Sequence, residues 1–249
     1  AFPINNDALV YSIDLKDKSE MITSLIYEDP YKLILLSRFK KPGVIITKTA
    51  TTYLSTGYLY WHLLDNNRVV YINTDEDTHT ESDGSYYIIH ILSIDKREDS
   101  EIKVSYDPIP YPEDLSPYLR GPGDPSIDRG FQVDVHLIEQ AYRDKKYLPS
   151  ALFLVVDRNY AFIIQHSIES LPGNSTSSTV ERPVDVVNLN TGEHIGTFRF
   201  TSGIQAIQNG YGYQIGVDDE GYMAIWKFRL SPAMYGLAED PDWRNKQEN

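Results

Sequence analysis

Apolar and polar positions alternate with a period of two along most of the chain, in short runs rich in Val, Ile, Tyr, Thr and Phe. This pattern is typical of β-strands. We therefore expect about fifteen strands and almost no helix. The predicted strands are Ala8–Leu15, Met21–Tyr27, Lys32–Phe39, Val44–Leu54, Tyr58–Leu64, Arg68–Thr74, Ser85–Asp95, Glu101–Tyr106, Ala151–Asp157, Tyr160–Ser167, Pro183–Leu189, His194–Phe200, Gly203–Gln208, Tyr211–Asp218 and Tyr222–Leu230.

Short polar segments separate these strands. Asn, Asp and Gly occur where a hairpin needs positive φ, and these residues tolerate that conformation. The segments are Asp65-Asn66-Asn67, Asp83-Gly84, Asn190-Thr191-Gly192, Asn209-Gly210 and Asp218-Asp219-Glu220-Gly221. The pattern predicts successive antiparallel hairpins.

One segment departs from the strand pattern. Six prolines lie between Pro108 and Pro125, which excludes a central strand and predicts a long irregular connection. It would be either a scaffold loop or a loop that lines a ligand site. Apolar residues then recur at helical spacing, which predicts one short helix over 134–143. We expect a single domain over 1–230 and a polar tail over 231–249.

The number of strands is typical of a β-sandwich or a β-propeller. The last third favours a propeller, because each of its hairpins cannot bury both faces alone. The expected fold class is therefore all-β, a propeller of four to six four-stranded antiparallel blades.

Two motifs in this region resemble the six-bladed, NHL-like β-propellers of exported bacterial proteins. The first, D-x-x-N-x-x-T-G-E-x-I-G-x-F, begins at Asp185, and the second, N-G-Y-x-Y-x-I-x-x-D-x-E-G-Y, begins at Asn209. The segment 143–151 resembles a link between blades of that family. Clear similarity covers 131–235, and weaker similarity extends back to Gly57. The resemblance implies blades around a central channel and a role in binding or scaffolding. Six blades need about 24 strands, so the N-terminal blades would be degenerate, missing or supplied by a partner.

The net charge limits the possible partners. With 23 Lys+Arg and 36 Asp+Glu, the formal charge is −13, which repels nucleic acid and anionic lipid. The short basic groups near Arg38 and Arg143 are mixed with acidic residues. No apolar run approaches the roughly 20 residues of a spanning helix. We expect protein partners, no nucleic acid and no membrane span.

The chain contains no cysteine, which excludes disulfides, thiolate catalysis and Cys-based metal sites. It opens Ala-Phe-Pro without an initiator Met or signal-peptide core, so it resembles a processed or trimmed chain. The family resemblance implies an exported protein, periplasmic or extracellular.

One acidic segment is a candidate metal site. Carboxylates crowd 73–84, and Ca²⁺ takes six to eight oxygen ligands, so calcium is the possible cofactor. The spacing is not that of an EF-hand, and a solvated hairpin tip is the alternative interpretation. The candidate ligands are Asp75, Asp77, Glu81 and Asp83.

Aromatic residues are abundant, with 19 Tyr and three Trp. Most should pack between sheets, but some could form a face that recognises sugar or peptide. The candidate binding residues are Tyr58, Trp61, Tyr211 and Trp226. His90 and His166 lie in apolar strands and are interpreted as core histidines with partners.

No catalytic residues are predicted, because the nucleophile-elbow, P-loop and dinucleotide-binding motifs are all absent from the sequence. The expected function is that of a non-enzymatic exported propeller acting as a binding or assembly module, such as a subunit of a larger complex. A calcium-supported hydrolase or lyase and a carbohydrate-binding module are the alternatives.

Overall fold

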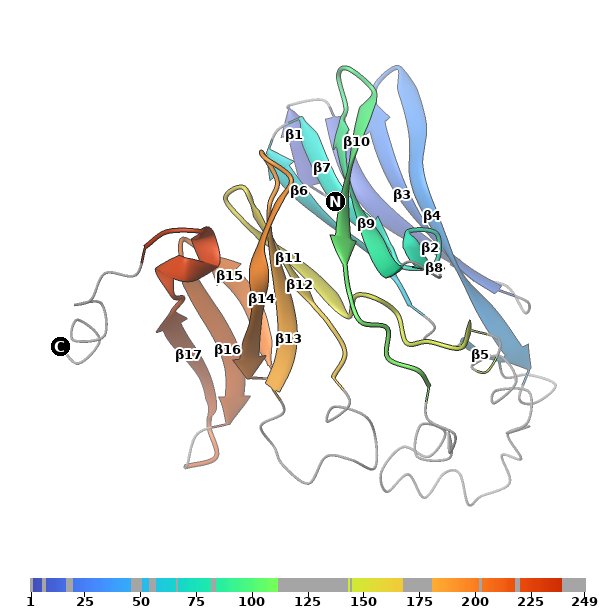
Figure 1. The fold of residues 1–249 in the computed structure, drawn as a ribbon. Coiled ribbons are helices and arrows are strands. Elements are labelled where there is room, and N and C mark those ends of the chain that lie inside the picture. Colours follow the sequence, from blue (N-terminus) through green and yellow to red (C-terminus); the bar gives the residue numbers. More distant parts are fainter. Residues whose placement is uncertain are drawn as a thin grey trace.

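The computed structural model describes residues 2–5, 8–16, 20–45, 51–53, 57–65, 67–81, 84–111, 143, 145–167, 181–201, 203–217 and 220–238. These residues form four antiparallel sheets that follow one another along the chain. Figure 1 shows them side by side, from the blue strands of the first sheet to the red-brown strands of the last.

The first two sheets contain the strands up to residue 105. The first has the order β1-β2-β3-β4-β5 and consists of β1 (Phe2–Asn5), β2 (Ala8–Lys16), β3 (Glu20–Asp29), β4 (Lys32–Ile45) and β5 (Thr51–Tyr53). The second has the order β10-β9-β7-β6, with β8 paired to β9, and consists of β6 (Leu59–Asp65), β7 (Arg68–Asn73), β8 (Thr78–Glu81), β9 (Gly84–Ser93) and β10 (Glu98–Ser105).

The other two sheets follow the proline-rich segment. The third consists, in order, of β11 (Phe153–Asp157), β12 (Tyr160–Ile164), β13 (Glu181–Asn188) and β14 (Glu193–Thr201). The fourth consists, in order, of β15 (Ile204–Gln208), β16 (Tyr211–Val217) and β17 (Met223–Arg229). A 3₁₀ turn, η2 (Pro232–Tyr235), follows β17 and buries Tyr235. None of the helices in the described part of the chain is long and apolar enough to cross a membrane.

Three apolar clusters join the four sheets in series, one at each interface. In β7, Val69 and Tyr71 belong to the cluster with the first sheet, while Val70 and Ile72 belong to the cluster with the third. In β12, Ala161 and Ile163 face the second sheet, and Phe162 faces the fourth. Because successive side chains of a strand point to opposite faces, a continuous apolar run buries both faces of a sheet. The two middle sheets are therefore covered on both sides.

The predicted propeller is wrong. The four sheets contain three to five strands each and do not close into a ring. A closed propeller would bury the outer faces of the first and last sheets against neighbouring blades. Here those faces are exposed, with Leu15 57% and Ile225 70% accessible.

Most predicted strands are present, with shifted ends, but two described strands were not expected. β1 precedes the first predicted strand, and β8 lies within the segment interpreted as an acidic loop. All but the last residue of the helix predicted over 134–143 lie outside the described residues, as does most of the proline-rich segment.

Candidate functional site

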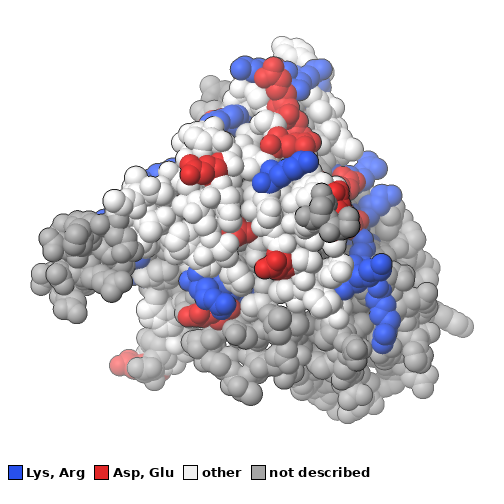
Figure 2. All heavy atoms as spheres, in the orientation of Figure 1, with Lys and Arg blue, Asp and Glu red and all other residues white. Residues whose placement is uncertain are grey.

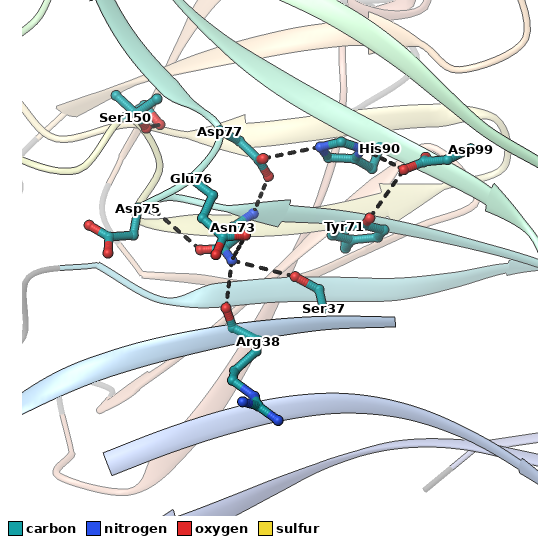
Figure 3. Close-up of polar contacts among 11 residues, drawn as sticks. Ser37, Arg38, Tyr71, Asn73, Asp75, Glu76, Asp77, His90, Asp99 and Ser150 are labelled. Carbon is teal, nitrogen blue, oxygen red and sulfur yellow. Dashed lines mark hydrogen bonds and ion pairs between the residues drawn. The ribbon is translucent and has the colours of Figure 1, made fainter. Parts of the chain in front are cut away.

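The turn after β7 ties the second sheet to the first. The Asp77 carboxylate accepts a hydrogen bond from the Asn73 backbone N–H at 2.6 Å. The Asn73 side-chain amide donates to the backbone carbonyl of Arg38, in β4, at 2.8 Å. Figure 3 shows Asn73 at the centre of these contacts. This part of the acidic segment is therefore an ordered turn in contact with the neighbouring sheet.

His90, in β9, lies between two carboxylates. Its Nε2 is 3.0 Å from Asp77 Oδ1, and its Nδ1 is 2.8 Å from Asp99 Oδ2. The imidazole stacks on the Tyr71 ring at 4.7 Å between centroids, and the Tyr71 hydroxyl donates to Asp99 at 3.3 Å. The dashed lines in Figure 3 follow this chain from Asp77 through His90 to Tyr71.

This arrangement favours the protonated imidazole. Burial alone would lower the pKa of His90, but the hydrogen bond and charge of Asp77, followed by those of Asp99, raise the pKa to about 9. A doubly protonated ring donates from both nitrogens, which suits an acceptor on each side. The Asp77–His90–Asp99 triad is therefore a charged tie within the second sheet.

The predicted calcium ligands have separate partners. Asp75 pairs with Lys145, Asp77 faces His90, and Glu81 accepts a hydrogen bond from the Tyr86 hydroxyl at 3.3 Å. Asp83 lies outside the described residues. Among the residues that the structure describes, no three His, Asp or Glu side chains are grouped as a metal ion requires.

The predicted aromatic binding residues lie in or directly beside strands of two separate sheets, Tyr58 and Trp61 at the second and Tyr211 and Trp226 at the fourth. Tyr58 packs between Phe39 and Tyr60 under the ammonium of Lys41, and Trp61 packs against the cluster between the first two sheets. The Lys227 ammonium lies 4.0 Å from the centroid of the Tyr211 ring. Both Tyr58 and Trp61 are thus engaged in packing.

Trp226 lies on the face of β17 that is directed at the third sheet. A Cβ on Gly216 would overlap its ring, so this glycine leaves space for the indole. The side chain remains 43% exposed. The structure therefore places Trp226 on the inner face of the fourth sheet, in a different sheet from Trp61.

The opposite, outer face of the fourth sheet is apolar and exposed. Ile215 pairs with Ile225, and Val217 pairs with Met223. Their exposed fractions are 46%, 70%, 61% and 77%, respectively. We call these four residues the last outer face.

The outer face of the first sheet has the same character. Alternate residues of β2 and β4 point away from the core, and each is at least 40% exposed. They are Leu9, Ile13, Leu15, Leu33 and Leu35. We call these five residues the first outer face.

A cavity of about 740 Å³ lies between the second and third sheets. Asp185, only 2% exposed, forms part of its wall. The carboxylate accepts hydrogen bonds from Tyr87 at 2.8 Å, Gln165 at 2.5 Å and Thr197 at 2.6 Å. His194 Nε2 lies 3.1 Å from the same carboxylate. Four side chains from β9, β14 and the end of β12 therefore hold one buried carboxylate.

His166, which also lines this cavity, is kept neutral. Burial, and secondarily the charge of Arg182, lowers the pKa of His166 to about 4. Burial and the neighbouring Asp185 raise the pKa of Tyr87, so the phenol remains a donor. His166 and Tyr87 are therefore both uncharged near neutral pH.

The sequence interpretation missed Asp185 as a site residue, although it held a signal. Asp185 stands alone between Val184 and Val186 in an apolar strand, and a buried charge requires partners. Its partner Tyr87 lies 98 positions away, so the pairing itself could not be inferred from local pattern.

On the face shown in Figure 2, Lys and Arg lie in small groups beside Asp and Glu, separated by uncharged surface.

No family model matches the sequence, and no curated protein matches it. Among solved structures, the chain is similar to that of uncharacterized protein lmo1340 from Listeria monocytogenes EGD-e, at 7% identity and a TM-score of 0.22. The match covers 90% of this chain and 80% of that one. A score this low carries no argument about fold or function.

Proposed function

We propose that this protein is an assembly module whose copies join head to tail, the last outer face of one copy packing on the first outer face of the next. The observation that carries the proposal is that both ends of the stack of sheets expose apolar faces. A location outside the cytoplasm remains a prediction that accompanies it.

The size and continuity of the last outer face support an interface. Its four apolar residues form two adjacent cross-strand pairs, so they make one patch rather than scattered contacts. Contiguous apolar patches on soluble proteins commonly mark sites of association. β17 is also the edge strand of its sheet.

A second copy fits this face because the chain already builds the same kind of contact three times. Each internal interface joins two apolar sheet faces. The first outer face offers such a surface, and Leu15 and Leu33 are 57% and 62% exposed. Because the two end faces differ, their contact is heterologous, and repeated contacts extend a chain of copies or close a ring.

The test uses two double variants and analytical ultracentrifugation. Met223→Lys/Ile225→Lys places charges on the last outer face, and Leu15→Lys/Leu33→Lys places them on the first. Each variant alone should be monomeric, and a mixture of both should form a species of two chains and none larger. Asn190→Lys/Thr191→Lys adds the same charge at an exposed turn and should leave association unchanged.

Two results would contradict the proposal. At about 100 μM, even a weak interface of this kind should be occupied. If the wild-type protein stays monomeric at this concentration, these faces bind another partner. Association that only the substitutions on the last outer face abolish would indicate a symmetric contact between two last outer faces.

A further inference from the structure

The cavity between the second and third sheets has the size and position of a ligand site. Small-molecule pockets typically have volumes of roughly 300–1,000 Å³, and the volume of this cavity, about 740 Å³, falls within that range. Its wall comes from the first residues of β9, the residues after β10 and β12, and strands β13 and β14. Two sheets therefore contribute to it, and neither alone would form it.

The Asp185 carboxylate sets the hydrogen-bonding direction of two wall residues. Gln165 Nε2 donates to it, which leaves the amide oxygen as an acceptor for other groups. The single O–H of Thr197 also donates to it, so the Thr197 oxygen can only accept from a ligand. Because the Tyr87 side chain is fully buried and bonded to the same carboxylate, this wall is rigid before any ligand binds.

The charges around the cavity oppose a charged ligand. Asp107 and Arg199 both line it, one of each sign, and both residues are exposed. A phosphate would meet Asp107 and Asp185, and a cation would meet Arg199.

The remaining wall groups suit hydroxyls and an apolar ring face. Ser85 and Ser105 each both donate and accept. Tyr106 lines the cavity and packs its ring against Tyr87 at 5.8 Å between centroids. Sugar rings present hydroxyls at their rim and C–H groups on their faces, and aromatic residues with polar handles recognise such surfaces.

We propose that this cavity binds a neutral saccharide, with Gln165 and Thr197 accepting from its hydroxyls and Arg199 donating to them. This site is separate from the outer faces at the ends of the stack, so it stands or falls independently of head-to-tail association.

The test measures binding by saturation-transfer NMR and calorimetry on the full chain. The probes are glucose, galactose, mannose, N-acetylglucosamine and their β-1,4-linked disaccharides, with inorganic phosphate and ethanolamine as charged comparators. At least one sugar should bind with a Kd below about 10 mM, an affinity of a few kcal/mol. The charged comparators should not bind in the cavity.

Arg199→Ala should weaken that binding at least about tenfold, the effect of losing one good hydrogen bond to a charged donor. Arg229→Ala removes an exposed arginine from the fourth sheet and should change nothing. Gln165→Leu removes a proposed acceptor and should also weaken sugar binding. Thermal unfolding of this variant shows whether it folds. Either no sugar binding, or sugar binding that survives both cavity variants, would overturn the proposal, as would phosphate binding that Arg199→Ala abolishes.

Discussion

His90 makes the stability of the protein depend on pH in a predictable direction. The pKa of His90 rises from its ordinary 6.5 to about 9 in the folded chain. The folded state thus holds the proton more tightly, and the resulting stability is fully present below pH 6.5. It is lost as the pH rises through 9. One pKa unit corresponds to about 1.4 kcal/mol, so the loss approaches about 3 kcal/mol.

The measurement is urea unfolding of wild type and His90→Gln at pH 6.5 and pH 9.5. The gap in free energy of unfolding between the two proteins should be large at the lower pH and shrink at the higher. His62→Gln, at an exposed histidine of β6, should keep a constant gap. If His90→Gln keeps the wild-type pH dependence, the Asp77–His90–Asp99 triad does not hold the proton.

Single residues show where sequence interpretation stops. The run of β-branched and aromatic residues in β7 predicted a strand, and its continuous apolar character indicates burial on both faces. Asp77 was predicted as a calcium ligand or part of a solvated hairpin tip, but it is buried, and its partners His90 and Asn73 were not identified. A carboxylate in a hairpin looks the same in sequence whether it faces solvent, calcium or a histidine, because the partner comes from tertiary contact.

Among the elements, the hairpin of β15 and β16 depends on one buried carboxylate of the third sheet. Asp157 accepts from the backbone N–H groups of Asn209 and Gly210 at 2.8 and 2.9 Å, and from the Tyr235 hydroxyl at 2.7 Å. Asp157 is 4% exposed, so water cannot readily replace it. These bonds fasten the turn of the fourth sheet, and the η2 segment, to the third sheet.

We expect Asp157→Ala to destabilise the protein by at least about 3 kcal/mol, because it leaves three donors without an acceptor. Tyr235→Phe removes one of these donors and should cost about half as much. Hydrogen exchange should quicken over 204–217 and stay unchanged over 84–105. Glu193→Ala, at the exposed first residue of β14, is the control. Equal acceleration in both segments would show that Asp157 acts on the whole stack and not on this hairpin.

The strands themselves were largely predictable, since the period of two and the turn residues are local features. The additional strand β8 was not, because Thr78–Glu81 is polar and pairs with β9 only at the margin of the sheet. Polar edge strands lack the apolar alternation from which strands are inferred.

At the scale of the whole molecule, the number and order of the hairpins favoured a ring, and the structure is an open stack. Closure depends on how the first and last faces meet, which is not encoded in any one hairpin. Leu15 and Ile225 belong to strands whose apolar pattern is typical of buried strands. The pattern therefore suggested that another part of the same chain covers them. The two outer faces have the apolar character of buried faces, but no other sheet of the chain covers them.

The net charge of −13 should set the salt dependence of the proposed association between copies. Like-charged copies repel, and salt screens that repulsion, with a Debye length of about 10 Å at 0.1 M that shortens to about 3 Å at 1 M. Contact between the two outer faces is apolar, so it is not weakened by screening. Raising NaCl from about 20 mM to about 500 mM should therefore increase the weight-average mass in sedimentation velocity. Met223→Lys/Ile225→Lys should stay monomeric at both salt concentrations. Association that weakens with salt would mean that charged groups, rather than the apolar faces, hold the copies together.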